Sequence, residues 1–244
     1  MANNQQVPVE AAGDASVMDV FLHQWELYQK FLHHDYLSNG KAYVILHRFL
    51  TAEFDRPFRF LDLACGDASG IVGALQGTRI TRYHGVDLAP PAIALARRNL
   101  EVLSCEVELE LADFTAAIRD LPERVDVVWI SLSLHHLATP EKRSVMRAIR
   151  TKLSGNGALL LYEPARHDDE DLPAYLDRFE ATGRRDWSAL QAHELREAMK
   201  HVRGCDLPET VSNWIALGRE AGFSTGAELF QAPTDLFRVF CYRM

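Results

Sequence analysis

Short apolar segments alternate with helix-forming segments from about residue 58 to residue 162, and this alternation constrains the fold more than any other feature of the chain. The segment 125–132 carries apolar residues on both of its faces. Such a strand must be covered on both sides, as central parallel strands are. Strands that alternate with helices predict an open, mostly parallel sheet. The other strands of this part are expected at 60–64, 83–88, 107–111 and 158–162.

The end of the chain follows a different pattern. A helix is expected at 209–221 and ends at Gly222, because glycine readily adopts the left-handed conformation that closes a helix. Two strands are expected at 223–230 and 236–243. Residues 231–235 between them are too few for a crossover helix, so the two strands must be antiparallel. The predicted fold is therefore α/β, with a mostly parallel seven-stranded sheet, helices on both faces and a C-terminal antiparallel hairpin.

The remaining segments add helices to this core without forming a second domain. Helical periodicity precedes the first strand, and a strongly charged segment follows the fifth. This charged segment would overhang the carboxyl edge of the sheet, where insertions can build substrate walls. The expected organisation is a disordered tail at 1–15 and a single domain at 16–244, which includes N-terminal cap helices at 16–55 and a helical insertion at 165–207.

Charge and composition narrow the range of partners. The formal net charge is −8 and no run of Lys or Arg stands out, which argues against nucleic acid and against an anionic membrane surface. The four cysteines match no zinc or redox spacing and are expected to be reduced thiols of a cytoplasmic protein. The N-terminus has no features of a signal peptide, and no apolar run is long enough to span a membrane. These features leave the oligomeric state open.

Polar residues follow the predicted strands at their carboxyl ends, where open α/β sheets bind ligands. Gly66 lies in the loop after the first strand, and its missing side chain lets the backbone approach a ligand closely. Asp87 ends the second strand and can accept hydrogen bonds from ribose hydroxyls. Asp113 follows the third strand and can accept from an adenine amine, with Phe114 packing near the ring. Together these residues suit a nucleoside ligand.

The same residues resemble the class I, Rossmann-like S-adenosylmethionine-dependent methyltransferases. Leu61-Asp-Leu-Ala-Cys-Gly66 is similar to the first motif of that family, and Gly85-Val-Asp87-Leu-Ala-Pro90 to the acidic loop after its second strand. The segment 125–137 resembles the fourth motif, and the whole resemblance covers about 58–162 and 209–244. It implies S-adenosyl-L-methionine as the cofactor. The cofactor contacts that it implies are Asp62, Ala64, Gly66, Asp87, Leu88, Asp113, Phe114 and Ser131.

The glycine loop departs from the family pattern at one position. The family often has a further glycine two residues after Gly66, and this chain has Ala68 there. An alanine fits if its φ angle stays negative, because positive φ is unfavourable for residues with a Cβ atom.

Five other residues are candidates on the substrate side. His135 and His136 follow the fourth strand, and either imidazole could accept a proton from the nucleophile, although packing and capping roles are equally compatible with the sequence. Glu163 follows the fifth strand and could point into the pocket or lie on the surface. Tyr28 and Tyr36 lie on the N-terminal helices, where they could contact substrate or pack in the core.

The predicted reaction is methyl transfer to an O or N nucleophile of a small molecule. Two alternatives remain: a non-catalytic S-adenosylmethionine-binding protein, and an NAD(P)-dependent oxidoreductase on a similar sheet. The absence of a GxGxxG loop disfavours the second. No metal ion is expected, because the acidic run at 167–171 has the pattern of a solvated loop.

Overall fold

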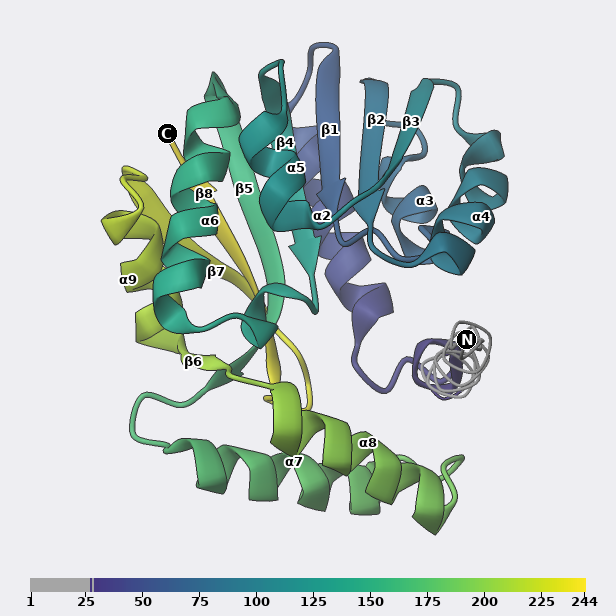
Figure 1. Cartoon of the computed structure of the whole chain (residues 1–244), viewed down its shortest axis with the longest axis vertical. Coiled ribbons are helices and arrows are strands. Elements are labelled where there is room, and N and C mark those ends of the chain that lie inside the picture. The colour runs from purple at the N-terminus through teal and green to yellow at the C-terminus, as the bar shows by residue number, and fades with distance from the viewer. Residues whose placement is uncertain (1–26, 28) are drawn as a thin grey trace, which may run out of the picture.

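A computed structural model describes residue 27 and residues 29–244 of the chain. The first part of the cap-helix region expected at 16–55 lies outside the described residues, and so does Tyr28. The chain forms a twisted sheet in the order β3-β2-β1-β4-β5-β8-β7 (Figure 1). The strands of this order are β1 (Phe58–Leu63), β2 (Ile80–Asp87), β3 (Glu106–Leu111), β4 (Val125–Ser131), β5 (Leu153–Arg166), β7 (Thr225–Gln231) and β8 (Phe237–Arg243).

The predicted sheet is confirmed in all but its strand count. β1 to β5 pair in parallel, whereas β8 is antiparallel to both of its neighbours, β5 and β7. An eighth strand, the short β6 (Glu209–Thr210), pairs with the end of β5. Sequence patterning missed β6 because two residues are too few to show a period.

Helices cover both faces of the sheet. One core cluster joins the sheet to α2, α3, α4, α7 and α8, and a second cluster joins it to α5, α6 and α9. The described helices are α2 (Asn39–Glu53), α3 (Ser69–Leu75), α4 (Pro90–Asn99), α5 (Phe114–Asp120), α6 (Thr139–Lys152), α7 (Leu172–Asp186), α8 (Ala192–Cys205) and α9 (Val211–Glu220), with 3₁₀ turns η1 (Leu100–Val102) and η2 (Leu134–His136).

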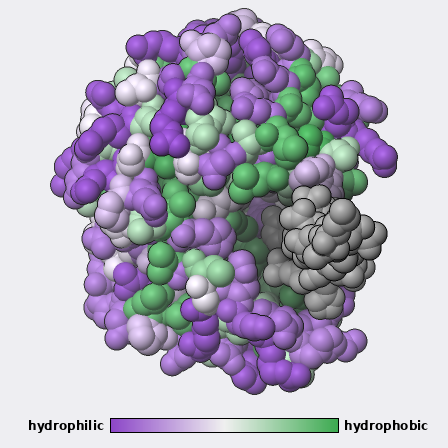
Figure 2. Space-filling view, in the orientation of Figure 1, coloured by the Kyte–Doolittle hydropathy of each residue, from purple (hydrophilic) through white to green (hydrophobic). Residues whose placement is uncertain are grey.

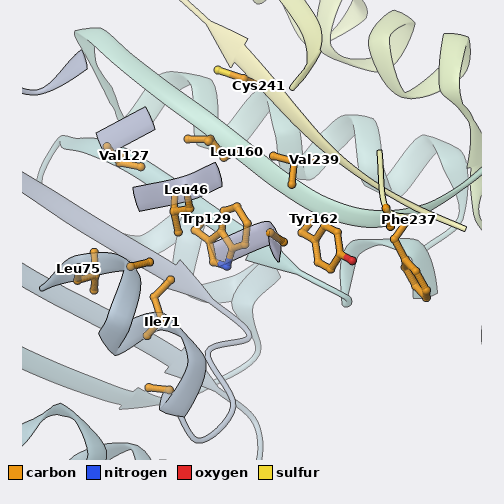
Figure 3. Packing of buried hydrophobic residues seen from close by; sticks show 14 of the residues in the cluster. Leu46, Ile71, Leu75, Val127, Trp129, Leu160, Tyr162, Phe237, Val239 and Cys241 are labelled. Carbon is orange, nitrogen blue, oxygen red and sulfur yellow. The ribbon is translucent and has the colours of Figure 1, made fainter. Parts of the chain in front are cut away.

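The central strand β4 supplies side chains to both cores. Val127 and Trp129 belong to the cluster under α2, and Val128 and Ile130 belong to the cluster under α5 and α6. Alternate residues of a strand point to opposite faces, so both sets are buried. Figure 3 shows Trp129 packed beside Leu46 of α2. This two-sided burial explains the continuous apolar character of the strand.

The charged segment after β5 forms two helices, α7 and α8, which lie beyond one end of the sheet (Figure 1). Figure 2 shows a recess on this face, between the part of the molecule that carries the sheet and the part that carries these helices. β5 itself is longer than expected and reaches Arg166, because β8 pairs along it from Ala158 to Pro164 and β6 pairs with its last two residues. The insertion therefore starts from an extended strand.

The end of the chain packs as the glycine pattern indicates. Gly222 follows α9 with a φ angle of 97°, the left-handed conformation expected after a helix. Within α9, a Cβ atom added at Gly218 would lie 2.1 Å from the ring of Tyr242. Glycine at this position therefore allows α9 to lie directly against β8. None of the described helices is both long enough and apolar enough to cross a membrane.

Candidate functional site

The loop between β1 and α3 has three left-handed residues at alternate positions. The φ angles are 59° at Ala64, 56° at Gly66 and 55° at Ala68. Ala68 therefore does not meet the condition of a negative φ angle under which an alanine fits without strain, and Ala64 shares the strained conformation. Each alanine costs about 1–2 kcal/mol in this region, because its Cβ atom crowds the following carbonyl. The loop thus keeps a glycine-type path even where two of its residues are alanine.

Asp87 ties this loop to the end of β2. Its two carboxylate oxygens accept hydrogen bonds from the backbone N–H groups of Gly66, at 2.8 Å, and Ala89, at 2.9 Å. A carboxylate has about four lone-pair sites, so acceptor capacity remains for two hydroxyl groups. Leu88 beside it is 64% exposed and offers an apolar surface. Asp87 and Leu88, both predicted from the sequence as cofactor contacts, therefore lie next to the glycine loop.

Asp113 caps α5 with one oxygen and leaves the other available. Oδ1 accepts from the backbone N–H groups of Thr115 and Ala116 and from the Thr115 hydroxyl. Oδ2 accepts no hydrogen bond from the described residues, and Asp113 is exposed. Phe114 follows it and packs partly into the second core. Both residues remain placed to contact a base.

A cavity of about 710 Å³ opens at the carboxyl ends of β1 and β4. The glycine loop and α3 form one wall, and α2 forms the opposite wall. Four of the predicted cofactor residues line it: Asp62, Ala64, Gly66 and Ser131. Asp87, Leu88, Asp113 and Phe114 are not among its lining residues and lie along the neighbouring ends of β2 and β3.

Asp62 is a buried carboxyl group on the wall of this cavity. It is 3% exposed, and the Tyr83 hydroxyl donates to its Oδ2 at 2.7 Å. Burial raises the pKa of Asp62 to about 7, against the lowering effect of the Tyr83 hydrogen bond and with a further increase from Asp87. A cationic ligand group nearby would favour the ionised form. Asp62 therefore suits a ligand that carries an ammonium or sulfonium charge.

Asn39 was missed by the sequence analysis. It is 5% exposed, lines the cavity from the first turn of α2, and its Oδ1 has no hydrogen-bond partner among the described residues. A buried amide oxygen without a donor is unfavourable, so a bound ligand that donates a hydrogen bond would stabilise it. Its sequence position resembles that of a helix-capping asparagine, and no other signal marks it. The structure instead places Ser38 at the cap, without a side-chain hydrogen bond.

The two predicted catalytic histidines lie away from the described walls of the cavity. His135 is 5% exposed, and its Nδ1 lies 2.6 Å from Oε2 of Glu163. Burial lowers the pKa of His135, but the carboxylates of Glu163 and Asp206 outweigh it and raise the pKa to about 9. The side chain of His136 is 37% exposed, and burial and His135 lower its pKa. The catalytic role of either histidine stays a prediction that the lining of the cavity does not support.

Glu163 points neither into the cavity nor to the surface. It is fully buried and accepts hydrogen bonds from the backbone N–H groups of Ser133, at 3.1 Å, and Leu134, at 2.8 Å. Together with His135 these contacts fix the loop after β4. Its predicted substrate contact is therefore corrected to a role in holding this loop.

Tyr36 connects the N-terminal segment with the insertion. Its hydroxyl accepts a hydrogen bond from the backbone N–H of Ala189 at 2.8 Å. Its ring stacks on that of Trp187, with 5.8 Å between the two ring centroids. Tyr36 is not among the described residues that line the cavity. The predicted substrate contact of Tyr28 lies outside the described residues.

The residues present fit S-adenosylmethionine. A Cβ atom added at Gly66 would meet nothing within 4 Å, so space lies in front of this backbone. Asn39 offers an unpaired acceptor inside the cavity, and Asp62 offers a carboxyl group. Both suit the amino-acid end of the cofactor, whereas Asp87 and Asp113 suit its ribose and adenine.

Comparison with known proteins agrees with this geometry. Residues 60–157 match the family model of a methyltransferase domain. The chain is similar to carboxy-S-adenosyl-L-methionine synthases: 24% identical over 175 residues to that of Idiomarina loihiensis, covering 70% of each chain. It is 27% identical over 168 residues to that of Glaesserella parasuis, covering 67% of this chain and 68% of the relative.

Solved structures share the fold. An O-methyltransferase family protein from Burkholderia thailandensis superposes with a TM-score of 0.63 at 20% identity over 83% of this chain, which spans about half, 55%, of that protein. The magnesium protoporphyrin IX methyltransferase from Synechocystis, with bound SAH, superposes with a TM-score of 0.58 at 15% identity, covering 85% of this chain and 84% of the other. Residues 60–157 therefore match a methyltransferase domain, and the chain shares its fold with S-adenosylmethionine-dependent methyltransferases of class I.

Proposed function

We propose that the protein transfers a methyl group from S-adenosylmethionine to an O or N nucleophile of a small molecule. The observation that carries this proposal is the cavity between the glycine loop and α2, which meets the carboxyl ends of β1 and β4. Its volume of about 710 Å³ lies in the range of small-molecule sites. Acidic residues on its lining, Asp35, Asp62 and Asp67, favour a cationic ligand.

Each part of the site has a distinct task in this reaction. Bound S-adenosylmethionine supplies an electrophilic methyl group on a positively charged sulfur. Asp87 holds the glycine loop in place and accepts from the ribose, while Asp62 and Asn39 accept from the amino-acid end. The wall formed by α2 excludes water and aligns the reactants, which is the main requirement of a direct transfer.

The acceptor side needs a base only if the nucleophile must lose a proton. His135 and His136 were predicted for this task, but their positions do not support it. His47 is an imidazole on the cavity wall, and its Nδ1 lies 3.0 Å from the carbonyl oxygen of Ala74. A carbonyl only accepts, so this contact places the proton on Nδ1 and leaves the lone pair on Nε2. His47 is therefore the base that we propose for a protic acceptor.

The partner and location follow from the same features. The net charge of −8 favours a small-molecule substrate over nucleic acid or an anionic membrane. All four cysteines are free in the structure, which supports a reducing, cytoplasmic location.

A methyl-transfer screen tests the proposal. The protein is incubated with S-adenosylmethionine and a metabolite library, and release of S-adenosylhomocysteine is measured. Asp87→Asn should weaken cofactor affinity at least about tenfold, because one of its two acceptor oxygens becomes a donor. Asp120→Asn, an exposed acid at the end of α5, is the matched control. Unchanged affinity in Asp87→Asn, or calorimetry that shows tight NADH binding and no response to S-adenosylmethionine, contradicts the proposal.

The relatives suggest a second candidate, a carboxy-S-adenosyl-L-methionine synthase. In that case S-adenosylmethionine would gain a carboxyl group from a carboxyl donor in the reaction mixture and be released in that form, rather than give up its methyl group. Mass spectrometry of the nucleosides in the reaction mixture separates the two. S-adenosylhomocysteine with a methylated acceptor supports the methyltransferase, and a carboxylated nucleoside supports the second candidate.

A further inference from the structure

A cluster of two histidines and one aspartate, of which only His136 is exposed, lies outside the cavity. His135 and His136 come from η2, and Asp206 comes from the end of α8. One ligand atom from each of the three residues can be chosen so that all lie within 4.8 Å of one another. The cluster therefore joins the loop after β4 to the residue that follows α8, near the end of the helical insertion.

Two of the three separations within this cluster are close to those between metal ligands. Oδ1 of Asp206 lies 3.5 Å from Nε2 of His135 and 3.4 Å from Nδ1 of His136. Two ligands of a tetrahedral zinc ion with bonds of about 2.0–2.1 Å are themselves about 3.3 Å apart. Both measured distances are close to that value and are long for hydrogen bonds between an imidazole and a carboxylate.

Asp206 has an unsatisfied acceptor that faces this space. It is 8% exposed, and its Oδ1 has no hydrogen-bond partner among the described residues. Buried carboxylate oxygens without a partner are costly, and Glu163 adds a second, fully buried carboxylate next to His135. A protonated His135 would offset one of these charges. A divalent cation would offset both and would give Oδ1 a ligand bond.

Glu163 also orients His135 for such a role. Its Oε2 lies 2.6 Å from Nδ1 of His135, so the ring keeps a proton on Nδ1. A metal ion would displace the proton on Nε2, the nitrogen that lies toward Asp206. Metal-bound histidines commonly donate their other N–H to a carboxylate in this way. Nδ1 of His136 lies 3.4 Å from the carbonyl oxygen of Cys205. Metal binding would require Nδ1 to lose its proton and would replace this contact.

We propose that His135, His136 and Asp206 bind one divalent transition-metal ion of the zinc class in tetrahedral geometry. Water fills the fourth position on the side where His136 is exposed. The ion fastens the helical insertion to the loop after β4, which begins at the cavity residue Ser131. The expectation of no metal concerned the run at 167–171, which contributes no ligand here.

Metal titration of the tag-free, full-length chain tests this site. The protein is stripped with EDTA and titrated with Zn²⁺ by calorimetry and with Co²⁺ by visible absorption. Wild type should bind one equivalent and give the intense spectrum of tetrahedral Co²⁺. Asp206→Asn and His136→Ala should each weaken Zn²⁺ binding at least tenfold. His167→Gln is the control, because His167 contacts Asp235 at 2.8 Å and shares no hydrogen bond with the three proposed ligands.

Folding is checked in the same experiment by thermal unfolding in EDTA, where the variants should remain folded. Zn²⁺ should then raise the melting temperature of wild type and of His167→Gln, but not of the other two variants. The proposal is overturned if wild type takes up no Zn²⁺, if the two ligand variants bind it as tightly as wild type, or if Co²⁺ gives the weak spectrum of an octahedral ion. If a ligand variant unfolds, Glu163→Gln replaces it and should weaken binding about 10- to 100-fold.

Discussion

Replacement of Asp62 by asparagine should change how protein stability depends on pH. The pKa of this buried carboxyl group is raised from 3.8 to about 7, mainly by burial. The folded protein therefore holds the proton more tightly than the unfolded chain does. Protonation of Asp62 stabilises the fold fully below about pH 3.8, and this contribution is lost as the pH rises through about 7.

The magnitude follows from these two pKa values. Relative to its protonated form, Asp62 should cost about 2 kcal/mol of unfolding free energy at about pH 5 and about 4 kcal/mol at about pH 8. Asparagine has a similar shape, can still accept from the Tyr83 hydroxyl and cannot ionise. The stability of Asp62→Asn relative to wild type should therefore rise by about 2–3 kcal/mol between about pH 5 and about pH 8.

Urea unfolding of both proteins at the two pH values measures this difference. All other titrating groups are shared, so their contributions cancel in the comparison. S-adenosylhomocysteine should reduce the pH dependence of wild type, because its ammonium group favours the Asp62 carboxylate. If the stability difference between the two proteins stays constant across this pH range, the raised pKa of the buried Asp62 carboxyl group is refuted.

Three further substitutions test the local packing and capping. Ala64→Gly should raise the unfolding free energy by about 0.5–1 kcal/mol in thermal unfolding, because relief of the left-handed alanine exceeds the added chain entropy; a loss of stability would argue against φ = 59° there. Gly218→Ala should lower it by about 1–3 kcal/mol, since the new Cβ atom would overlap the Tyr242 ring, and a neutral result would contradict this packing. Asp113→Ala should cost about 1 kcal/mol through loss of the α5 cap and should also weaken cofactor binding by calorimetry; loss of stability alone would limit Asp113 to capping.

The order of elements could be predicted from the sequence because each one carries a local signal. The apolar character of 125–132 on both faces indicated a central strand, and the short spacing at 231–235 required an antiparallel hairpin. β6 and the extension of β5 to Arg166 could not be predicted. They depend on pairing with distant strands, which leaves no period in the sequence.

The cofactor side of the site was more predictable than the substrate side. Gly66 and Asp87 each belong to a short continuous motif, and the hydrogen bond between them forms where the adjacent strands β1 and β2 end. The role of Asn39 depends on how α2 docks against the loop, and the contact of Glu163 with His135 depends on side-chain direction at the end of β5. Neither feature is encoded in local spacing.

A crystal structure with bound S-adenosylhomocysteine tests the central claim most directly. The ribose should lie within hydrogen-bond distance of Asp87, and the amino-acid tail should face the Gly66 backbone, with its ammonium group near Asp62 and Asn39. Density for the nucleoside away from the carboxyl ends of β1 and β2, or a cavity beside α2 that stays empty at saturating ligand, would contradict the account.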